Sequence, residues 1–305
     1  MDVKSDKVEI KDGSKISYRF HGDIKNPTVV FVSGSIFNFK QFDYVLFPRF
    51  QKHLQGEYSF LFYDYVGING SSQIEGEFDF LEITRQHVEL LDALSIEQAH
   101  HFGYSKGALI SYLTAASNPN RVLSVGSYGT PNLASSDPTT QQEFSTRLQY
   151  LNSISGIWDQ LVNEKNYKIV YDTVFLPTIF RGKQSSTLGP IDKIKNWWIR
   201  NKLKPLLEGT LVENLVKLYQ LYKQDITEEE KERYITAMKG IEQQTILLHG
   251  IKDEIIPFHT AEELHEMVKN SQLVKFKKFS HSSPVLLKGQ GNAIMKVYAN
   301  FLNHL

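Results

Sequence analysis

A serine between two glycines is the residue of this chain best placed to do chemistry. Gly103–Gly107 fits the pattern G-x-S-x-G, with Ser105 at its centre. The stretch follows a short run, Ala99–Phe102, that we interpret as a strand, and it precedes apolar residues spaced as on a buried helix. A serine on such a turn has an exposed hydroxyl, and the next amide lies at a helix N-terminus that favours negative charge. The sequence therefore predicts a nucleophile, Ser105, and one oxyanion donor, the amide of Lys106.

A serine hydroxyl needs a base to accept its proton and a carboxylate to orient that base. Asp253 comes three residues after the expected strand Thr245–Gly250. His281 follows the alternating run Leu273–Phe279, which we also interpret as a strand. A carboxylate just past a strand end lies at the edge where open α/β sheets place their sites. We therefore predict that Asp253 and His281 complete a triad with Ser105, in the chain order Ser, Asp, His.

Other carboxylates and histidines remain alternatives for these two roles. Glu254 is adjacent to Asp253, and Asp137 follows an earlier expected strand. For these carboxylates the alternative is an ordinary solvated side chain. Several histidines are expected to be structural or solvated: His100, His101, His249, His259 and His265.

The second oxyanion donor is expected in the loop after the strand Thr28–Val32. The chain continues there with Ser33, Gly34, Ser35 and Ile36. Gly34 permits a tight turn, so the amide of Ser35 is the first candidate donor and that of Ile36 the second. An ordinary turn is the alternative interpretation.

These motifs together resemble those of the α/β-hydrolase superfamily. The resemblance rests on Gly103–Gly107, on Asp253 in a G-x-x-D-x-x-x-P pattern, on His281 and on the loop at Gly34. The stretch Asp64–Ser72 also resembles the superfamily's Asp-x-x-Gly-x-Gly-x-Ser turn, with one extra residue between the glycines. The resemblance covers nearly the whole chain apart from its middle third. It implies an α/β fold, a mostly parallel central sheet flanked by helices, that carries a Ser–His–Asp triad.

The chain departs from the superfamily pattern at two positions. Ser33 stands where many members have histidine, and Lys106 stands where apolar residues or glutamine are commoner. At the position of Ser33, a related enzyme that joins two hydroxyacyl chains also has a residue other than histidine. An acyl transferase is therefore one alternative. A signalling or ligand-sensing protein is another, because Asp64–Gly67 resembles hydrolase-like bacterial stress-response regulators. A lyase or a haloperoxidase of this fold is a third alternative.

Our main expectation is a serine hydrolase that cleaves a carboxylic ester or thioester through an acyl-enzyme on Ser105. The chain has 34 basic and 34 acidic residues, which gives no electrostatic reason to expect nucleic acid as a partner. It has no cysteine and shows no metal-ligand spacing, so we expect neither a metal nor a cofactor. Residues 1–20 lack an apolar signal region, and no apolar run reaches about 20 residues. A cytoplasmic protein without a membrane span is therefore expected.

Alternating strands and helices predict a mostly parallel sheet with helices on both faces. The resemblance implies that residues 1–131 and 240–305 form one hydrolase core and that the helical segment between them, residues 132–239, is a cap. The core is expected to begin with a hairpin around Gly13 and to contain a helix within Phe39–Leu54 that Pro48 starts or kinks. Helical patterns within the cap cover residues 144–161, 191–207, 211–222 and 228–238. The cap is rich in aromatic residues, so we expect some of them to line a pocket for an apolar acyl group. Lys193–Trp198 is expected to be a helix face; contact with a membrane or an acyl carrier protein is the alternative.

Overall fold

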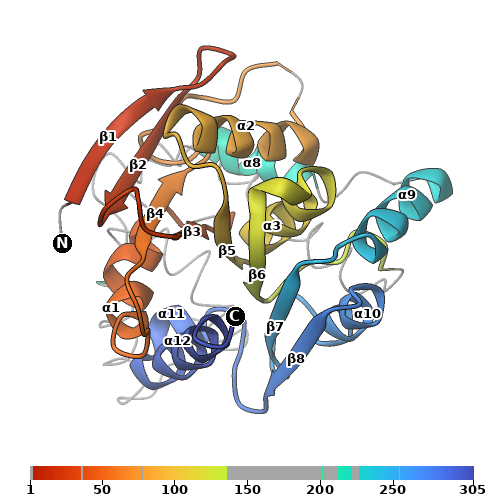
Figure 1. Ribbon diagram of the computed structural model, residues 1–305. Coiled ribbons are helices and arrows are strands. Elements are labelled where there is room, and N and C mark those ends of the chain that lie inside the picture. Colours follow the sequence, from red (N-terminus) through yellow and green to blue (C-terminus); the bar gives the residue numbers. More distant parts are fainter. Residues whose placement is uncertain are drawn as a thin grey trace, which may run out of the picture.

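The computed structural model describes residues 3–35, 37–76, 78–135, 201, 212–221, 227–253 and 255–305. Its centre is an eight-stranded sheet with the strand order β1-β2-β4-β3-β5-β6-β7-β8 (Figure 1). The strands are β1 (Val3–Glu9), β2 (Lys15–His21), β3 (Thr28–Val32), β4 (Ser59–Asp64), β5 (Ala99–Tyr104), β6 (Val122–Tyr128), β7 (Gln244–Gly250) and β8 (Ser271–Phe276). β2 pairs antiparallel with β1 and with β4, and the strands from β4 to β8 in this order pair in parallel.

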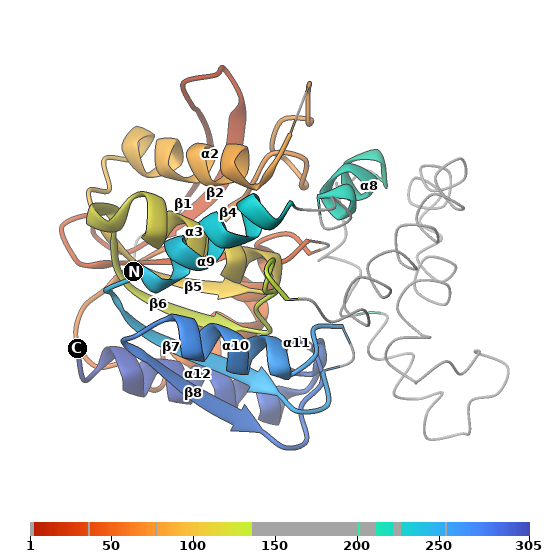
Figure 2. The same ribbon diagram turned by 90° about the vertical axis from the view of Figure 1, so that its right-hand side faces the viewer.

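Helices cover both faces of this sheet. On one face lie α2 (Phe80–Ala93), α3 (Lys106–Ser117), α9 (Glu228–Lys239) and α10 (His259–Met267) (Figure 1). On the other lie α1 (Phe47–Phe50), α11 (Ser283–Leu286) and α12 (Lys288–Leu302). Two short turns, η1 (Gln41–Leu46, a π-helix) and η2 (Pro119–Arg121, a 3₁₀-helix), precede α1 and β6. The remaining helix, α8 (Val212–Gln220), lies beyond the carboxyl ends of the parallel strands (Figure 2).

Local sequence explains where several helices begin. Asp79 caps α2, because its side chain accepts a hydrogen bond from the amide of Glu82. α9 begins with a capping box in which Thr227 and Glu230 bond each other's backbone amides.

α8 is held against the turn that follows β4, where the Lys217 ammonium donates to the carbonyl of Ile74.

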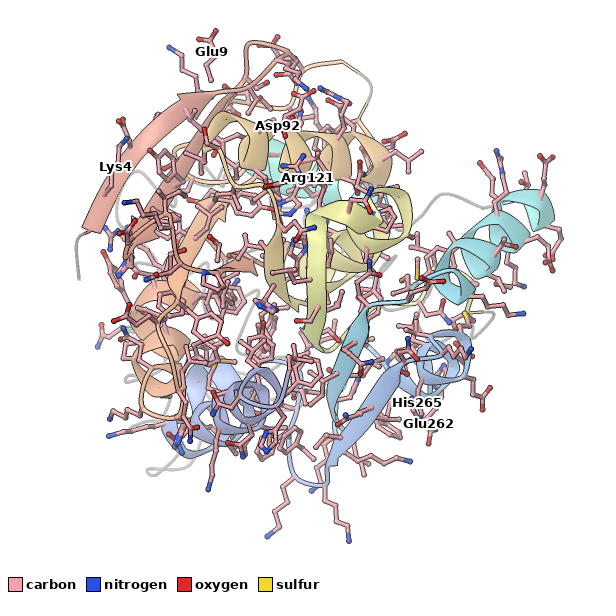
Figure 3. The ribbon with its side chains drawn as sticks, in the orientation of Figure 1. Lys4, Glu9, Asp92, Arg121, Glu262 and His265 are labelled. Carbon is pink, nitrogen blue, oxygen red and sulfur yellow. The ribbon has the colours of Figure 1, made fainter. Side chains whose placement is uncertain are left out.

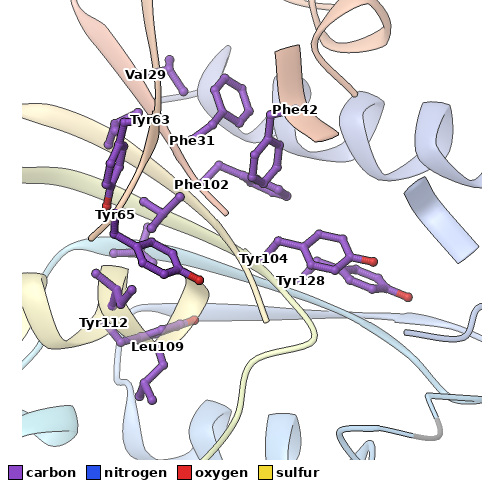
Figure 4. Packing of buried hydrophobic residues seen from close by; sticks show 14 of the residues in the cluster. Val29, Phe31, Phe42, Tyr63, Tyr65, Phe102, Tyr104, Leu109, Tyr112 and Tyr128 are labelled. Atoms are coloured by element: carbon purple, nitrogen blue, oxygen red, sulfur yellow. The ribbon is translucent and has the colours of Figure 1, made fainter. Parts of the chain in front are cut away.

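The core is aromatic because the central strands are buried on both faces. β3 and β4 are buried along their whole lengths, and Phe31 stacks on Phe62 with ring centroids 5.0 Å apart. Phe42 and Phe102 pack against the same cluster (Figure 4). Several ion pairs lie at the periphery, and one of them joins Arg121 to Asp92, 2.6 Å apart (Figure 3). The apolar core therefore fixes the sheet, and the sheet fixes the loops at its edge.

The structure confirms the predicted α/β class, the mostly parallel sheet and the opening hairpin. The helical stretch expected within Phe39–Leu54 is also confirmed, as η1 and α1, and Pro48 lies in the first turn of α1, where a missing amide proton costs nothing. One element boundary was wrong. The strand expected to reach Phe279 ends at Phe276, because Phe279 turns back and stacks on Phe276, with ring centroids 4.5 Å apart.

Much of the expected cap lies outside the described residues. The predicted helix over residues 144–161, the residues 193–198 and nearly all of the helix predicted over residues 191–207 fall there. Two of the predicted cap helices are described, as α8 and α9. The cap boundaries therefore stay a prediction. No helix within the described part of the chain is long and apolar enough to cross a membrane.

Candidate active site

Ser105 lies on a strained turn between β5 and α3. Its backbone has φ 54° and ψ −122°, a conformation that residues other than glycine seldom adopt and that functional sites often hold. The amide of Ser105 donates to the carbonyl of Tyr128 at the end of β6, 2.9 Å away. Ser105 is half-buried, as a reactive serine reached by a substrate must be.

The two flanking glycines let backbones approach each other closely at this turn. A Cβ atom added to Gly107 would lie 2.0 Å from the carbonyl oxygen of Val32, and one added to Gly103 would lie 2.3 Å from the Cα atom of Ala108. Both distances are too short for any other residue type, so the G-x-S-x-G spacing is a packing requirement here. The start of α3 consequently lies directly on the end of β3.

Asp253 and His281 meet at the same edge of the sheet. Asp253 follows β7, and its Oδ2 atom accepts a hydrogen bond from His281 Nδ1 over 2.7 Å. Its Oδ1 atom accepts from the amides of Ile255 and Ile256 at 2.9 and 2.8 Å. Both the carboxylate and the imidazole are buried. His281 is thus tethered through Nδ1, which leaves Nε2 as the nitrogen available for a proton from elsewhere.

Burial alone raises the pKa of Asp253, but the neighbouring His281 and its hydrogen bond lower it, with help from His249 and the Ile256 amide. The net effect holds the pKa of Asp253 below its usual range. His249 lies 3.5 Å from the same carboxylate oxygen, and its Nε2 atom pairs with the carbonyl of Ile256. Burial, as the largest effect, lowers the pKa of His249. A buried, neutral His249 suits a supporting role better than that of a proton acceptor.

Gly129 and Tyr104 connect Ser105 to this pair. Gly129 directly follows the residue that binds the Ser105 amide, and a Cβ added to it would lie 2.9 Å from His281 Cε1 and 3.3 Å from Asp253 Oδ2. Its φ of 62° also favours glycine. The Tyr104 hydroxyl donates to the carbonyl of His281, and the two rings lie 5.6 Å apart. The three predicted residues therefore share one neighbourhood at the carboxyl ends of β5, β6 and β7.

The amides of Ser35 and Lys106 lie beside Ser105, and neither donates a backbone hydrogen bond to a residue that the structure describes. Both residues are buried, and buried amides are seldom left unpaired in folded proteins. Lys106 is the first residue of α3, so its amide cannot bond within the helix. The amide of Ser35 is close to Ser105 because the preceding residue, Gly34, packs on it: a Cβ added to Gly34 would lie 3.5 Å from Ser105 Cβ. Ile36, the alternative donor, lies outside the described residues.

The side chain of Lys106 is fully buried, contrary to what its type suggests. Its Nζ atom lies 4.0 Å from the centre of the Tyr65 ring and has no hydrogen-bond partner within the described part of the chain. Burial lowers the pKa of this amine well below its usual range. The Tyr65 hydroxyl in turn donates to the carbonyl of Gly34 over 2.5 Å. Tyr65, Tyr104 and Gly129 were missed by sequence reasoning, because none has a diagnostic spacing from Ser105.

The other competing carboxylates and histidines either lie away from this site or fall outside the described residues. Glu254 and Asp137 are outside the described residues. His100 bonds Ser124 within the sheet, and His265 bonds Ser271 at the end of α10. His101 is buried within β5, and His259 begins α10. Among the described residues, no three potential ligands from His, Cys, Asp or Glu gather in a way that would hold a metal ion.

Comparison with known proteins bears on the class of this fold. The family model described as "alpha/beta hydrolase fold" matches residues 27–166. The fold described above agrees with this match and supports the resemblance to the α/β-hydrolase superfamily.

Three known proteins are similar to this chain in sequence or in fold. A protein of Acinetobacter calcoaceticus named bifunctional esterase/perhydrolase is 23% identical over 280 residues, which cover 91% of this chain and 93% of that protein. The structure is similar to an enol-lactonase from Burkholderia xenovorans, with a TM-score of 0.72, 16% identity and coverage of 98% of this chain and 100% of that one. It is also similar to an esterase from Exiguobacterium antarcticum, with a TM-score of 0.69, 16% identity and coverage of 97% and 100%.

Proposed function

We propose that this protein is a serine hydrolase that cleaves a carboxylic ester or thioester through an acyl-enzyme on Ser105. The observation that carries the proposal is the arrangement at the sheet edge. Ser105 lies on a strained turn, and its amide bonds the carbonyl of Tyr128. The next residue, Gly129, packs on the hydrogen-bonded pair of Asp253 and His281. The esterases among its relatives support the same reaction type.

The first half of the reaction acylates the serine. The Ser105 Oγ atom attacks the substrate carbonyl carbon while its proton passes to His281 Nε2. The carbonyl oxygen becomes an anion that the amides of Lys106 and Ser35 hold. Asp253 keeps the proton of His281 on Nδ1 and stabilises the imidazolium. When the tetrahedral intermediate collapses, the leaving alcohol or thiol takes the proton from Nε2 and the acyl group stays on Ser105.

The second half releases the acyl group. A water molecule gives a proton to His281 Nε2 and attacks the acyl carbon, and the same amides hold the second oxyanion. Collapse returns the proton to Ser105 and frees a carboxylic acid. The acceptor need not be water: a hydroxyl group in its place makes an acyl transferase. The relative named bifunctional esterase/perhydrolase favours keeping this alternative, and product analysis distinguishes the outcomes.

We propose an apolar acyl group, because the segment 132–239 is rich in aromatic residues and amphipathic patterns. The only cation described next to Ser105 is Lys106, and its amine is buried against an aromatic ring instead of being presented as a clamp for an anion. The leaving group can be an alcohol or a thiol, and an acyl carrier protein would supply the latter.

A fluorophosphonate probe followed by intact-mass measurement tests the proposal. The parent protein should gain one probe mass and hydrolyse a panel of esters and thioesters, and Ser105→Ala should do neither. Ser117→Ala is the matched control, because Ser117 lies on α3 with an exposed side chain bonded to its own helix. It should label like the parent. Equal labelling of Ser105→Ala and the parent, at another residue, would refute the assignment.

A further inference from the structure

Tyr65 contacts both sides of the candidate oxyanion hole without belonging to either. It follows β4, whereas Ser105 follows β5 and Gly34 follows β3. Its hydroxyl donates to the Gly34 carbonyl over 2.5 Å, and the Lys106 amine lies 4.0 Å from the centre of its ring. The side chain is almost completely buried, and Figure 4 shows its ring lying above α3. One tyrosine thus bridges the loop after β3 and the first residue of α3.

The bond to Gly34 has a geometric consequence for the next residue. In a trans peptide the carbonyl of one residue and the amide of the next point in nearly opposite directions. When Tyr65 fixes the carbonyl of Gly34 on its own side, the amide of Ser35 must point away from Tyr65. That amide is one of the two beside Ser105 that donate no backbone hydrogen bond to a described residue. Without the tyrosine hydroxyl, the peptide would be free to rotate and the buried carbonyl would lose its partner.

We propose that Tyr65 is a positioning residue for the oxyanion hole: its hydroxyl orients the Gly34–Ser35 peptide toward Ser105, and the buried Lys106 side chain holds its ring in place. This inference rests on the proposed serine-hydrolase function and adds a residue to it. The proposal also gives a role to Lys106, a residue type that is unusual at the position after the nucleophile. A contact between an amine and an aromatic face is directional, so it fixes the ring more closely than an aliphatic chain of the same length.

The variant Tyr65→Phe removes only the hydroxyl. Loss of an oxyanion-hole donor typically lowers kcat by about 10²- to 10³-fold, so a loosened donor should lower it by roughly 10- to 100-fold. KM should change by less than about threefold, because the amide acts on the transition state more than on the bound ester. Tyr112→Phe is the matched control. Tyr112 is also buried and its hydroxyl bonds Ser127, away from the oxyanion loop. Its kcat should equal that of the parent.

A second readout separates positioning from simple loss of stability. An alkyl trifluoromethyl ketone forms a tetrahedral adduct with a serine, and the adduct's oxyanion needs the same donors. The affinity of the ketone for Tyr65→Phe should fall by the same factor as kcat/KM. The active sites in each preparation are counted by fluorophosphonate titration. If kcat and ketone affinity stay within about twofold of the parent, Tyr65 is merely structural and the inference is refuted.

Lys106→Met tests the other contact, since it keeps the backbone amide and removes the amine. It should lower kcat in the same direction, by a smaller factor than Tyr65→Phe. An unchanged kcat would overturn the role given to the Lys106 side chain, and this variant also serves if Tyr65→Phe does not fold. A parent protein that neither labels with the probe nor binds the ketone would instead refute the proposed function itself.

Discussion

A pair of buried histidines should make the stability of this protein steeply dependent on acid. The ring of His87 stacks on Tyr63, with centroids 5.3 Å apart, and meets the edge of His101 at 4.9 Å. None of the four ring nitrogens has a hydrogen-bond partner among the described residues. Burial, and to a lesser extent the Arg121 charge, lower the pKa of His87 to about 3. Burial also lowers the pKa of His101 well below its usual range.

The sign of the effect follows from proton uptake by the two states. In the unfolded chain each histidine takes up a proton below about pH 6.5, whereas the folded state keeps both rings neutral. The unfolded state therefore binds more protons between about pH 6.5 and pH 3, and stability falls as the pH falls. For His87 alone the slope approaches about 1.4 kcal/mol per pH unit, or about 2 kcal/mol between about pH 7.5 and pH 5.

The variant His87→Phe keeps a stacking ring and removes one titrating group. Urea unfolding followed by far-UV circular dichroism at about pH 7.5 and pH 5 should show that the variant loses about 2 kcal/mol less than the parent over this interval. Burial raises the pKa of Asp64 to about 7, although hydrogen bonds from Asn69 and Phe39 oppose this shift. Asp64 therefore makes the folded state more stable in acid, which is the opposite of the histidine effect. It does so equally in both proteins and cancels in the comparison.

The control is His304→Phe, because His304 is exposed near the end of the chain. It should lose as much stability in acid as the parent. Parallel stability curves for His87→Phe and the parent would refute the argument. That result would mean that His87 takes up its proton in the folded state, through water or a rearrangement of the cluster.

Four further expectations concern the proposed reaction. Asp253→Asn should lower kcat by about 10³- to 10⁴-fold with the fold retained, and near-parent activity would contradict the role of this carboxylate. The kcat/KM of the parent should fall in acid along a single limb, because the base must be neutral to accept the Ser105 proton and the lowered pKa of Asp253 keeps that carboxylate ionised, and two limbs would contradict this. Activity should survive dialysis against a chelator, whereas a loss restored by zinc would reveal a metal site. Specificity constants should rise from acetyl to decanoyl esters by up to roughly fourfold per methylene, and a maximum at acetyl would indicate a small pocket.

Sequence reasoning located the main features because they depend on local pattern and chain order. Parallel strands end at one edge of a sheet, so residues that follow such strands are expected together there. Asp253 and His281 fulfil this expectation with a hydrogen bond, although one strand ends earlier than its alternating pattern suggests. The glycines around Ser105 belong to the G-x-S-x-G pattern, and the short distances that an added Cβ would make to neighbouring backbone show why glycine is needed there.

The supporting residues are not predictable in this way, because their partners come from unrelated parts of the chain. Tyr104 bonds the backbone of a residue 177 positions away, and Tyr65 bonds one 31 positions away. A tyrosine in a strand end is typical of any buried sheet, so its type indicates packing and not the direction of its hydroxyl. Only the three-dimensional arrangement shows which carbonyl accepts the hydrogen bond.

Lys106 shows how a departure from a family pattern can acquire a physical explanation. A lysine that follows the candidate nucleophile suggests an exposed charge, yet its side chain is completely buried and its pKa is lowered by that burial. Such burial costs free energy unless a neighbour offsets it, and the ring of Tyr65 is the neighbour observed. Because the same tyrosine holds the carbonyl of Gly34, the unusual lysine and the oxyanion loop are coupled through one side chain. A substitution at position 106 should therefore change catalysis through Tyr65, in addition to any effect on stability.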